Sequence, residues 1–477
     1  MNGRFARISA YLTEPDAARW QRRLFVVGAL LGWVMLFITP PFFGNDEEDY
    51  VFRAWQLSQG QLIADHRPGF SGGDIPSNWY QPWVSFSDPA SLDFYCRIPV
   101  DSVLHYTNRP LNSEQTQPID FRNTALYSPV GFLPHLPAMW VGQALNLPAF
   151  TVIYLARGLQ YIVWLLLMVL AIRRLPGSGF FWLLLIFLPM SLYQATTVTV
   201  DGLNNSLAFL FIASVLRWRA LHLTLTRKRL AFALVCLLAF VLIKQMYVLL
   251  GLFLLILTAA QWGGLWRKVV WVSALMLVAM LIGGLWSKLA FQVYEPMHAD
   301  IFGIQNPPEQ LRFLLSHPLV YAQALFAGVA EWGAVLWDSW LGVLGKTSVE
   351  LPPSVYLLLT TAVCALLVID RPMLIRTPLY VRVVSFGTFA LGVAAMFTII
   401  VMTNHSPGEL RFDGVVGRYL IPFAPLLWVA LQPNLPRLVR PNWLALFTGG
   451  VMVFALLQSL RALVLRFYGV DFIHLLF

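Results

Sequence analysis

Long apolar runs separated by short polar or basic segments dominate the chain. The runs are roughly 15 to 25 residues long, and about 20 apolar residues suffice for a helix to cross a bilayer. The pattern predicts an all-α integral membrane protein with about 11 transmembrane helices. The predicted spans are 24–43, 150–172, 180–196, 202–216, 230–243, 247–262, 269–291, 355–369, 383–402, 419–431 and 443–464.

Two further apolar segments, 127–145 and 319–344, have interrupted patterns. The first contains three prolines, and the second contains Glu331 and Asp338. If either segment alone crossed the membrane, every later basic cluster would move to the opposite side. We therefore interpret both as external interfacial or re-entrant helices, and a membrane-spanning course is the alternative.

The composition excludes most other classes of protein. Hydrophobic residues make up 58% of the 477 residues, charged residues make up 12%, and the mean hydropathy is +0.65. Soluble domains carry roughly 25% charged residues. A soluble globular enzyme, a disordered chain and a fibrous repeat protein are therefore excluded.

The net charge of +9 indicates orientation rather than a nucleic-acid partner. Short cytoplasmic loops of membrane proteins collect Lys and Arg. A cytoplasmic N-terminus places 19 of the 33 basic residues in cytoplasmic loops or tails. No cleavable signal is evident and the three cysteines form no disulfide framework. We expect a multi-pass protein that retains its first span.

This orientation divides the chain into seven consecutive parts. A cytoplasmic tail precedes the first span, and two external segments alternate with two groups of spans before an external tail. The parts are 1–23 (tail), 24–43 (first transmembrane helix), 44–149 (external acidic loop with interfacial helices), 150–291 (transmembrane helices), 292–352 (external loop), 353–465 (C-terminal transmembrane helices) and 466–477 (external tail).

Four consecutive acids, Asp46 to Asp49, follow the first predicted span. Segment 44–126 holds 11 of the 24 acidic residues but only 5 of the 33 basic ones. The acids are consistent with a solvated helix start, because Asp and Glu favour the first turn of a helix. Alternatively, one of them is a catalytic base, or Asp46, Glu47 or Asp49 binds a divalent cation such as Mg or Mn.

Three cations on the external side oppose the positive-inside rule. Arg157 lies about two turns into its predicted span, Lys244 lies between two spans, and Arg418 begins another. Together they are suited to hold a lipid-linked phosphate, because Arg binds phosphate oxygens in a bidentate way and Lys as a point charge. The alternative for each is snorkelling to lipid headgroups.

Two other polar residues belong to this external side. Arg53 lies in a short amphipathic helix that we expect over 51–57 on the membrane surface. Asp201 begins a predicted helix, so it is either an N-cap or a part of the site.

Several short motifs, in order along residues 24–440, resemble a bacterial family of polytopic membrane proteins of unknown function that is grouped with the GT-C glycosyltransferases. The matching segments are Asp46-Glu47 with Arg53 to Gly60, Tyr127-Ser128-Pro129 with Leu133-Pro134, Tyr154 to Arg157, Pro189 with Asp201, Lys244 with Tyr247, Gly342 to Pro352, and Gly417 to Pro422. The chain departs from the family at two positions: Tyr50 replaces a frequent His, and Val416 replaces a frequent Gln.

The resemblance implies a GT-C-like bundle with a large first external loop, in the bacterial cytoplasmic (inner) membrane. It implies transfer of a sugar from a polyprenyl (undecaprenyl) phosphate donor to an envelope glycan, a lipid or another acceptor on the external face, with inversion and with no required cofactor. A divalent cation is possible. The implied site consists of catalytic Asp46 and Glu47, phosphate-binding Arg418, Lys244 and Arg157, and substrate-binding Asp49, Arg53, Asp201, Tyr247 and Tyr419.

Two alternatives to a sugar transferase remain at this point. One is a transporter or flippase for a lipid-linked glycan, although no internal repeat typical of transporters is visible. The other is a polymerase or ligase that moves a whole glycan from a lipid pyrophosphate.

Overall fold

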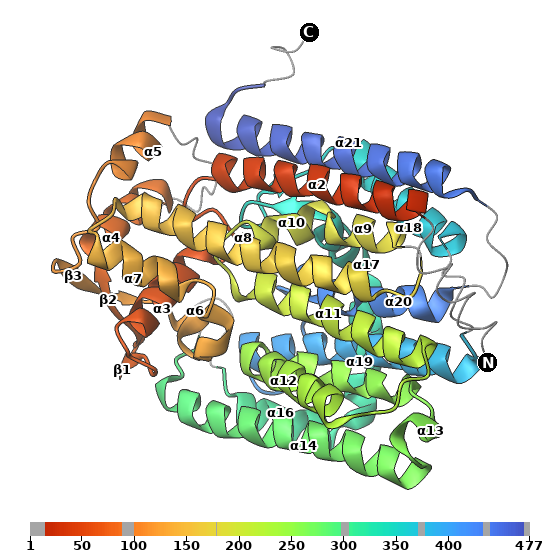
Figure 1. Cartoon of the computed structure of the whole chain (residues 1–477). Helices are drawn as coiled ribbons and strands as arrows, with labels where there is room; N and C mark the ends of the chain where they lie inside the picture. Colours follow the sequence, from red (N-terminus) through yellow and green to blue (C-terminus); the bar gives the residue numbers. More distant parts are fainter. Residues whose placement is uncertain are drawn as a thin grey trace.

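The computed structural model describes residues 15–87, 100–177, 179–296, 305–370, 377–432 and 439–471. Six long helices run side by side along one direction, and the N-terminal end of the chain lies at one end of this bundle (Figure 1). The outermost parts of the predicted tails, 1–14 and 472–477, lie outside the described residues. The six helices are α2 (Pro15–Ile38), α8 (Ala149–Arg174), α11 (Val200–Ala220), α14 (Leu265–Ala290), α19 (Leu379–Asn404) and α21 (Pro441–Tyr468).

The described residues contain six helices that are long and apolar enough to cross a membrane, or seven if one bent pair is a single span. The bent pair is α10 (Pro189–Ala195) with α11, which meet at 117°. The count of about 11 spans is thus not reproduced by length and composition. The remaining predicted spans are shorter elements: α9 (Phe180–Ile186), α12 (Arg227–Ile243), η2 (Gln245–Ile256), α13 (Ala259–Trp262), α18 (Pro353–Ile369), η4 (Gly417–Phe423) and α20 (Ala424–Leu431).

Two local features explain the shortening. The predicted span 180–196 breaks before Pro189, where Leu188 is extended with ψ 140°, because proline disfavours helical conformation in the residue before it. The predicted span 247–262 is likewise divided, into the 3₁₀ helix η2, which ends at Ile256, and the short helix α13, which begins at Ala259.

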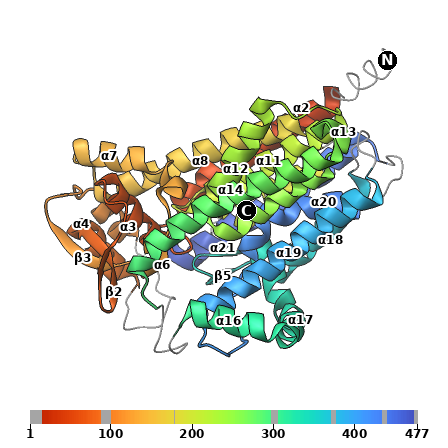
Figure 2. The ribbon, with the colours of Figure 1, turned by 90° about the horizontal axis from the view of Figure 1, so that it is seen from below.

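The helix α17 (Pro318–Gly342) lies differently from the others. It runs across the long helices in Figure 1 and is seen close to end-on in Figure 2. By length and composition it qualifies as a span, with only 11% of its most apolar window buried. The short helices α16 (Pro307–Ser316) and η3 (Phe291–Val293) precede it along the chain.

The segment between α2 and α8 is folded at the opposite end from the N-terminus (Figure 1). It contains a three-stranded antiparallel sheet in the order β1-β2-β3, with Gly72 paired to both Asp65 and Asp120. The fold is therefore not purely helical. Its elements are α3 (Glu47–Ser58), β1 (Asp65–Arg67), β2 (Phe70–Pro76), α4 (Ser77–Ser87), α5 (Val100–Thr107), β3 (Thr116–Asp120), α6 (Arg122–Ala125), η1 (Pro129–Phe132) and α7 (Leu136–Ala144).

The helix α3 is buried within this folded segment and does not lie on a membrane surface as predicted. Arg53 donates hydrogen bonds inside the protein to Gln56 and to the carbonyl oxygens of Leu62 and Tyr127, and only its Nε among its donor nitrogens has no partner among the described residues. Because buried polar groups need such partners, this network permits the helix to be enclosed.

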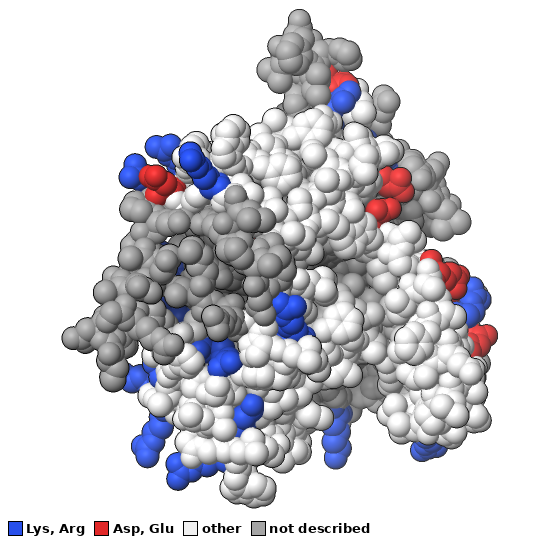
Figure 3. Space-filling view, turned by 90° about the vertical axis from the view of Figure 1, so that its right-hand side faces the viewer, with Lys and Arg blue, Asp and Glu red and all other residues white. Residues whose placement is uncertain are grey.

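The two ends of the bundle differ in charge. The end that carries the N-terminus displays many Lys and Arg side chains and few acids (Figure 3). The four acids Asp46 to Asp49 lie at the other end, at the start of α3. A short hairpin, β4 (Val343–Leu344) and β5 (Val349–Glu350), returns from α17 to this acidic end.

Candidate functional site at the acidic end of the bundle

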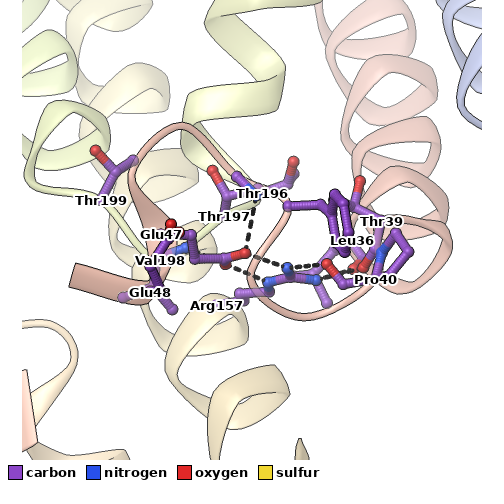
Figure 4. Close-up of polar contacts among 12 residues, drawn as sticks. Leu36, Thr39, Pro40, Glu47, Glu48, Arg157, Thr196, Thr197, Val198 and Thr199 are labelled. Carbon is purple, nitrogen blue, oxygen red and sulfur yellow. Dashed lines mark hydrogen bonds and ion pairs between the residues drawn. The ribbon is translucent and has the colours of Figure 1, made fainter. Parts of the chain in front are cut away.

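Glu47 and Arg157 form a completely buried ion pair (Figure 4). Arg157 Nε and Nη2 donate to the two oxygens of Glu47 at 2.7 and 2.6 Å. The remaining guanidinium N–H groups donate to the carbonyl oxygens of Leu36, Thr39 and Pro40 at 2.6 to 3.0 Å. Arginine has five N–H donors, so every one of them is engaged.

This ion pair joins three parts of the chain. Arg157 binds carbonyl oxygens at the C-terminus of α2, where a helix has unpaired acceptors and negative partial charge. Glu47 also accepts from the backbone N–H of Gly44 and Val198 at 3.0 and 2.8 Å. A saturated, enclosed pair cannot reach a substrate without breaking. The geometry therefore favours a positioning role for Glu47 and Arg157 over the catalytic and phosphate-binding roles expected from the sequence.

Asp46, by contrast, faces an open space. It precedes the first residue of α3 in a left-handed conformation with φ 54°, and its side chain is 41% exposed. Its carboxylate lies 3.1 Å from Arg418 Nη2. The neighbouring Glu47 anchors the backbone of Asp46, so the side chain is held at the rim of the buried acidic segment.

Arg418 is positioned by a close packing of η4 against α17. A Cβ atom at Gly417 would lie 1.8 Å from the carbonyl oxygen of Leu336, so only glycine fits there. The Gly417 N–H donates to Ser339 Oγ at 2.7 Å. Arg418 itself is buried, and its Nε has no hydrogen-bond partner among the described residues. This guanidinium, unlike that of Arg157, keeps one buried N–H donor without a partner among the described residues.

Lys244 and Asp201 lie close to the same tyrosine as Arg418. Lys244 Nζ is 2.5 Å from Asp201 Oδ1 and 4.4 Å from the ring centroid of Tyr419. Arg418 lies 5.2 Å from that centroid. Tyr247 donates a hydrogen bond to the carbonyl oxygen of Tyr419 at 3.0 Å. Asp201 is thus a partner of Lys244, and the N-cap alternative is wrong, because α11 begins at Val200 with Thr199 as its N-cap.

Sequence reasoning missed Lys346, which forms an ion pair with Glu48. Lys346 lies between Gly345 and Thr347, and all three have left-handed backbones, with φ 57°, 56° and 66°. This conformation is strained for a β-branched residue such as Thr347. No sequence motif predicted the contact, because it depends on the hairpin returning to α3.

Burial changes the protonation of the acids beside Asp46. It raises the pKa of Glu48, and Lys346 opposes that shift. Burial, and next the negative charges of Glu48 and Asp46, raise the pKa of Asp49 well above its usual range. The charged form of Asp49 is therefore disfavoured. Of Asp46 and Asp49, Asp46 has the more exposed carboxylate.

A buried tyrosine, Tyr50, and a partly buried one, Tyr127, lie beside the acidic segment. The rings of Tyr50 and Tyr127 stack with centroids 6.0 Å apart. Burial raises the pKa of Tyr127 to about 12. Tyr50 occupies the position where the resembling family often has His, so an aromatic contact stands there in this chain.

The remaining expectations concern Arg53 and metal binding. Arg53 is fully buried and donates to protein acceptors, so it supports α3 from inside. Among the residues that the structure describes, no group of three or more His, Cys, Asp or Glu side chains is arranged to hold a metal ion.

These features define a multi-pass helical membrane protein with a cluster of acids, cations and tyrosines at one end. The chain belongs to the family described as "Predicted membrane protein (DUF2142)", whose model matches residues 29–427. No curated protein and no solved structure matches the chain. The family description supports the membrane class and names no activity.

Proposed function

We propose that this protein is a membrane glycosyltransferase that moves a sugar from a polyprenyl phosphate, such as undecaprenyl phosphate, to an envelope glycan, a lipid or another acceptor. The observation that carries the proposal is the pair of Asp46 and Arg418. It places an accessible carboxylate beside a buried guanidinium that has an unused N–H donor.

The proposed reaction is a single displacement at the anomeric carbon. The acceptor oxygen forms a bond to this carbon, and the bond between the carbon and the phosphate oxygen breaks. The electron pair leaves with the polyprenyl phosphate, and the acceptor proton passes to Asp46. Attack from the face opposite the phosphate inverts the anomeric configuration.

Arg418 and Lys244 are the cations proposed to stabilise the phosphate. Phosphate binding to Arg418 competes with its ion pair to Asp46, because both anions use the same guanidinium edge. The donor would thus release Asp46 to act as a base. Lys244 remains beside Tyr419, and Asp201 holds it there.

The architecture proposed for this activity is of the GT-C type, with the 44–149 segment as its first external loop. The basic end of the bundle would face the cytoplasm under the positive-inside rule, and Asp46 would face the periplasm or exterior of a bacterial inner membrane. The course of α17 across the long helices supports an interfacial or re-entrant placement.

Transfer in proteoliposomes tests the proposal. A panel of radiolabelled polyprenyl-phosphate sugars is supplied with crude envelope acceptors to the wild type, Asp46→Asn and Arg418→Ala. We expect label in the acceptor for the wild type and a loss of at least about 100-fold in each variant. Asp74→Asn and Arg411→Ala are matched controls on exposed residues and should retain activity.

The same assay separates the alternatives. Label that crosses the bilayer unchanged indicates a flippase, and transfer only from a lipid pyrophosphate glycan indicates a polymerase or ligase. Retained configuration in the product would refute the single displacement. Full activity of Asp46→Asn would refute its role as the base.

A further inference from the structure

A cleft lies beside the hairpin, away from the Asp46 and Arg418 pair. Its volume is about 590 Å³, it is open to the outside, and it is lined by the chain segment 348–352 and the last turns of α21. This volume lies within the range of about 300–1,000 Å³ that is typical of small-molecule sites. The family model ends at residue 427, so the α21 wall lies outside the matched region.

The α21 wall combines arginines with an apolar surface. Gln458, Arg461, Ala462 and Leu465 all line the cleft, and their spacing of three and four residues places them on one helix face. Arg466 adds a second guanidinium to the lining. The wall therefore has a cationic part and an apolar part in contact with each other.

Arg461 is held in place by an acid beyond the end of the helix. Its Nε and Nη2 donate to the two carboxylate oxygens of Asp471 at 2.9 and 2.5 Å. Its side chain remains 34% exposed. An arginine that snorkels freely to lipid headgroups has no need of such an anchor, so the position of Arg461 is built into the fold.

The cleft lies at the C-terminal end of a helix that is long and apolar enough to cross a membrane, which favours a ligand from the membrane surface. The helix α21 has 28 residues and an apolar window long enough to cross a bilayer. Arg461 and Arg466 lie in its last two turns, where a spanning helix meets lipid headgroups. The opposite wall supplies Ser348, Glu350 and the apolar Leu351.

We propose that this cleft is a second lipid-binding site, which binds the phosphate headgroup of a membrane lipid. The Nη1 group of Arg461, which the ion pair with Asp471 does not use, would donate to the phosphate oxygens, and Arg466 would add positive charge beside it. Leu351 and Leu465 would contact the first carbons of the lipid chain. The phosphate belongs either to a glycerophospholipid or to a polyprenyl phosphate.

The cleft and the Asp46 site share one chain segment. Lys346 contacts Glu48 on one side, and Ser348 to Pro352 line the cleft on the other. A lipid in the cleft would thus rest against the same hairpin that supplies the cation beside the acids. The proposal concerns binding alone and does not rest on glycosyl transfer.

Native mass spectrometry of the full-length protein, delipidated in detergent, tests the proposal. The added probes are dioleoylphosphatidylglycerol, undecaprenyl phosphate and zwitterionic dioleoylphosphatidylcholine, each alone. We expect tight binding of one of the two anionic lipids at this site. Arg461→Gln with Arg466→Gln should weaken it by about tenfold or more, because a hydrogen bond to a charged group and a second positive charge are lost. The probe that binds more tightly identifies the source of the phosphate.

Two further variants keep the test decisive. Ala462→Phe fills the cleft and leaves both arginines in place, and it should weaken binding to a similar extent. Lys288→Gln removes an exposed cation from the last turn of α14 and should leave binding unchanged. Equal losses in the Lys288 control, or no loss in Ala462→Phe, would overturn the proposal and leave only nonspecific attraction to headgroups.

Discussion

Asp46 and Arg418 lie 372 positions apart in the chain, and their side chains meet at 3.1 Å. One is the residue before α3 and the other is the second residue of η4. Each is fixed by its neighbour: Glu47 anchors the first, and the close contact of Gly417 with α17 fixes the second. The pair is consequently a junction between the folded acidic segment and the C-terminal half of the bundle.

The buried pair of Glu47 and Arg157 predicts a large effect on stability. Glu47→Gln or Arg157→Lys leaves buried donors or a buried charge without partners, and breaking such a pair costs about 3–5 kcal/mol. We expect a lower apparent melting temperature and less monodisperse protein in detergent for both variants. Asp16→Asn, which breaks an exposed pair with Arg19, should change little. Wild-type stability in Arg157→Lys would contradict the saturated arrangement.

Gly417 predicts a loss of function that does not require a change in any charged residue. A Cβ atom at this position collides with the backbone of Leu336 and Trp340, so Gly417→Ala must displace η4 and with it Arg418. Misplacement by about 1 Å can lower a rate about 100-fold. Gly450→Ala is the matched control, because nothing lies within 4 Å of its Cβ. Equal transfer rates in the two alanine variants would show that η4 tolerates the added atom.

The raised pKa of Asp49 predicts how stability depends on pH. Its pKa in the folded protein exceeds the unfolded value, so the folded state binds more protons between the two values. This contribution to stability is fully present below the ordinary Asp pKa of about 3.9 and is lost as pH rises through the raised value. We expect the melting temperature of the wild type to fall as the pH rises above the ordinary Asp value and through the raised one. Asp49→Asn should flatten that dependence, whereas Asp74→Asn should not.

Lys346 and Glu48 predict a coupled pair of substitutions. Lys346→Met leaves Glu48 buried without its cation, which we expect to cost about 3 kcal/mol. Adding Glu48→Gln removes the unpaired charge and should restore most of the stability. Thermal unfolding of the two single variants and the double variant measures this coupling. Additive losses in the double variant would show that the two side chains do not depend on each other.

The sequence predicted the membrane class and the polar residues of the acidic end, and it did so from charge and spacing. Lys244 and Arg418 were predicted to be cations on the external side, and in the structure both lie beside Tyr419. Arg157 was also predicted to be an external cation that holds a phosphate. Its partners are instead Glu47 and three carbonyl oxygens at the end of α2. Carbonyl groups are common to all residues, so no sequence pattern marks which ones an arginine will meet.

Neither the number of spans nor the contact made by Lys346 could be predicted from the sequence, for a related reason. Apolar runs report length, but the 117° bend between α10 and α11 and the 3₁₀ course of η2 depend on how neighbours pack. Lys346 meets Glu48 across 298 positions. Such a contact follows from the return of a hairpin, which local composition does not encode.

The saturation of Arg157 has a consequence for how this family varies. One carboxylate and three backbone carbonyls consume its five donors, so neither position 47 nor position 157 can change alone without leaving a buried polar group unmatched. A substitution at one of the two positions therefore requires a matching substitution at the other. Among relatives we expect them to covary strictly, with an acid at one whenever arginine occupies the other.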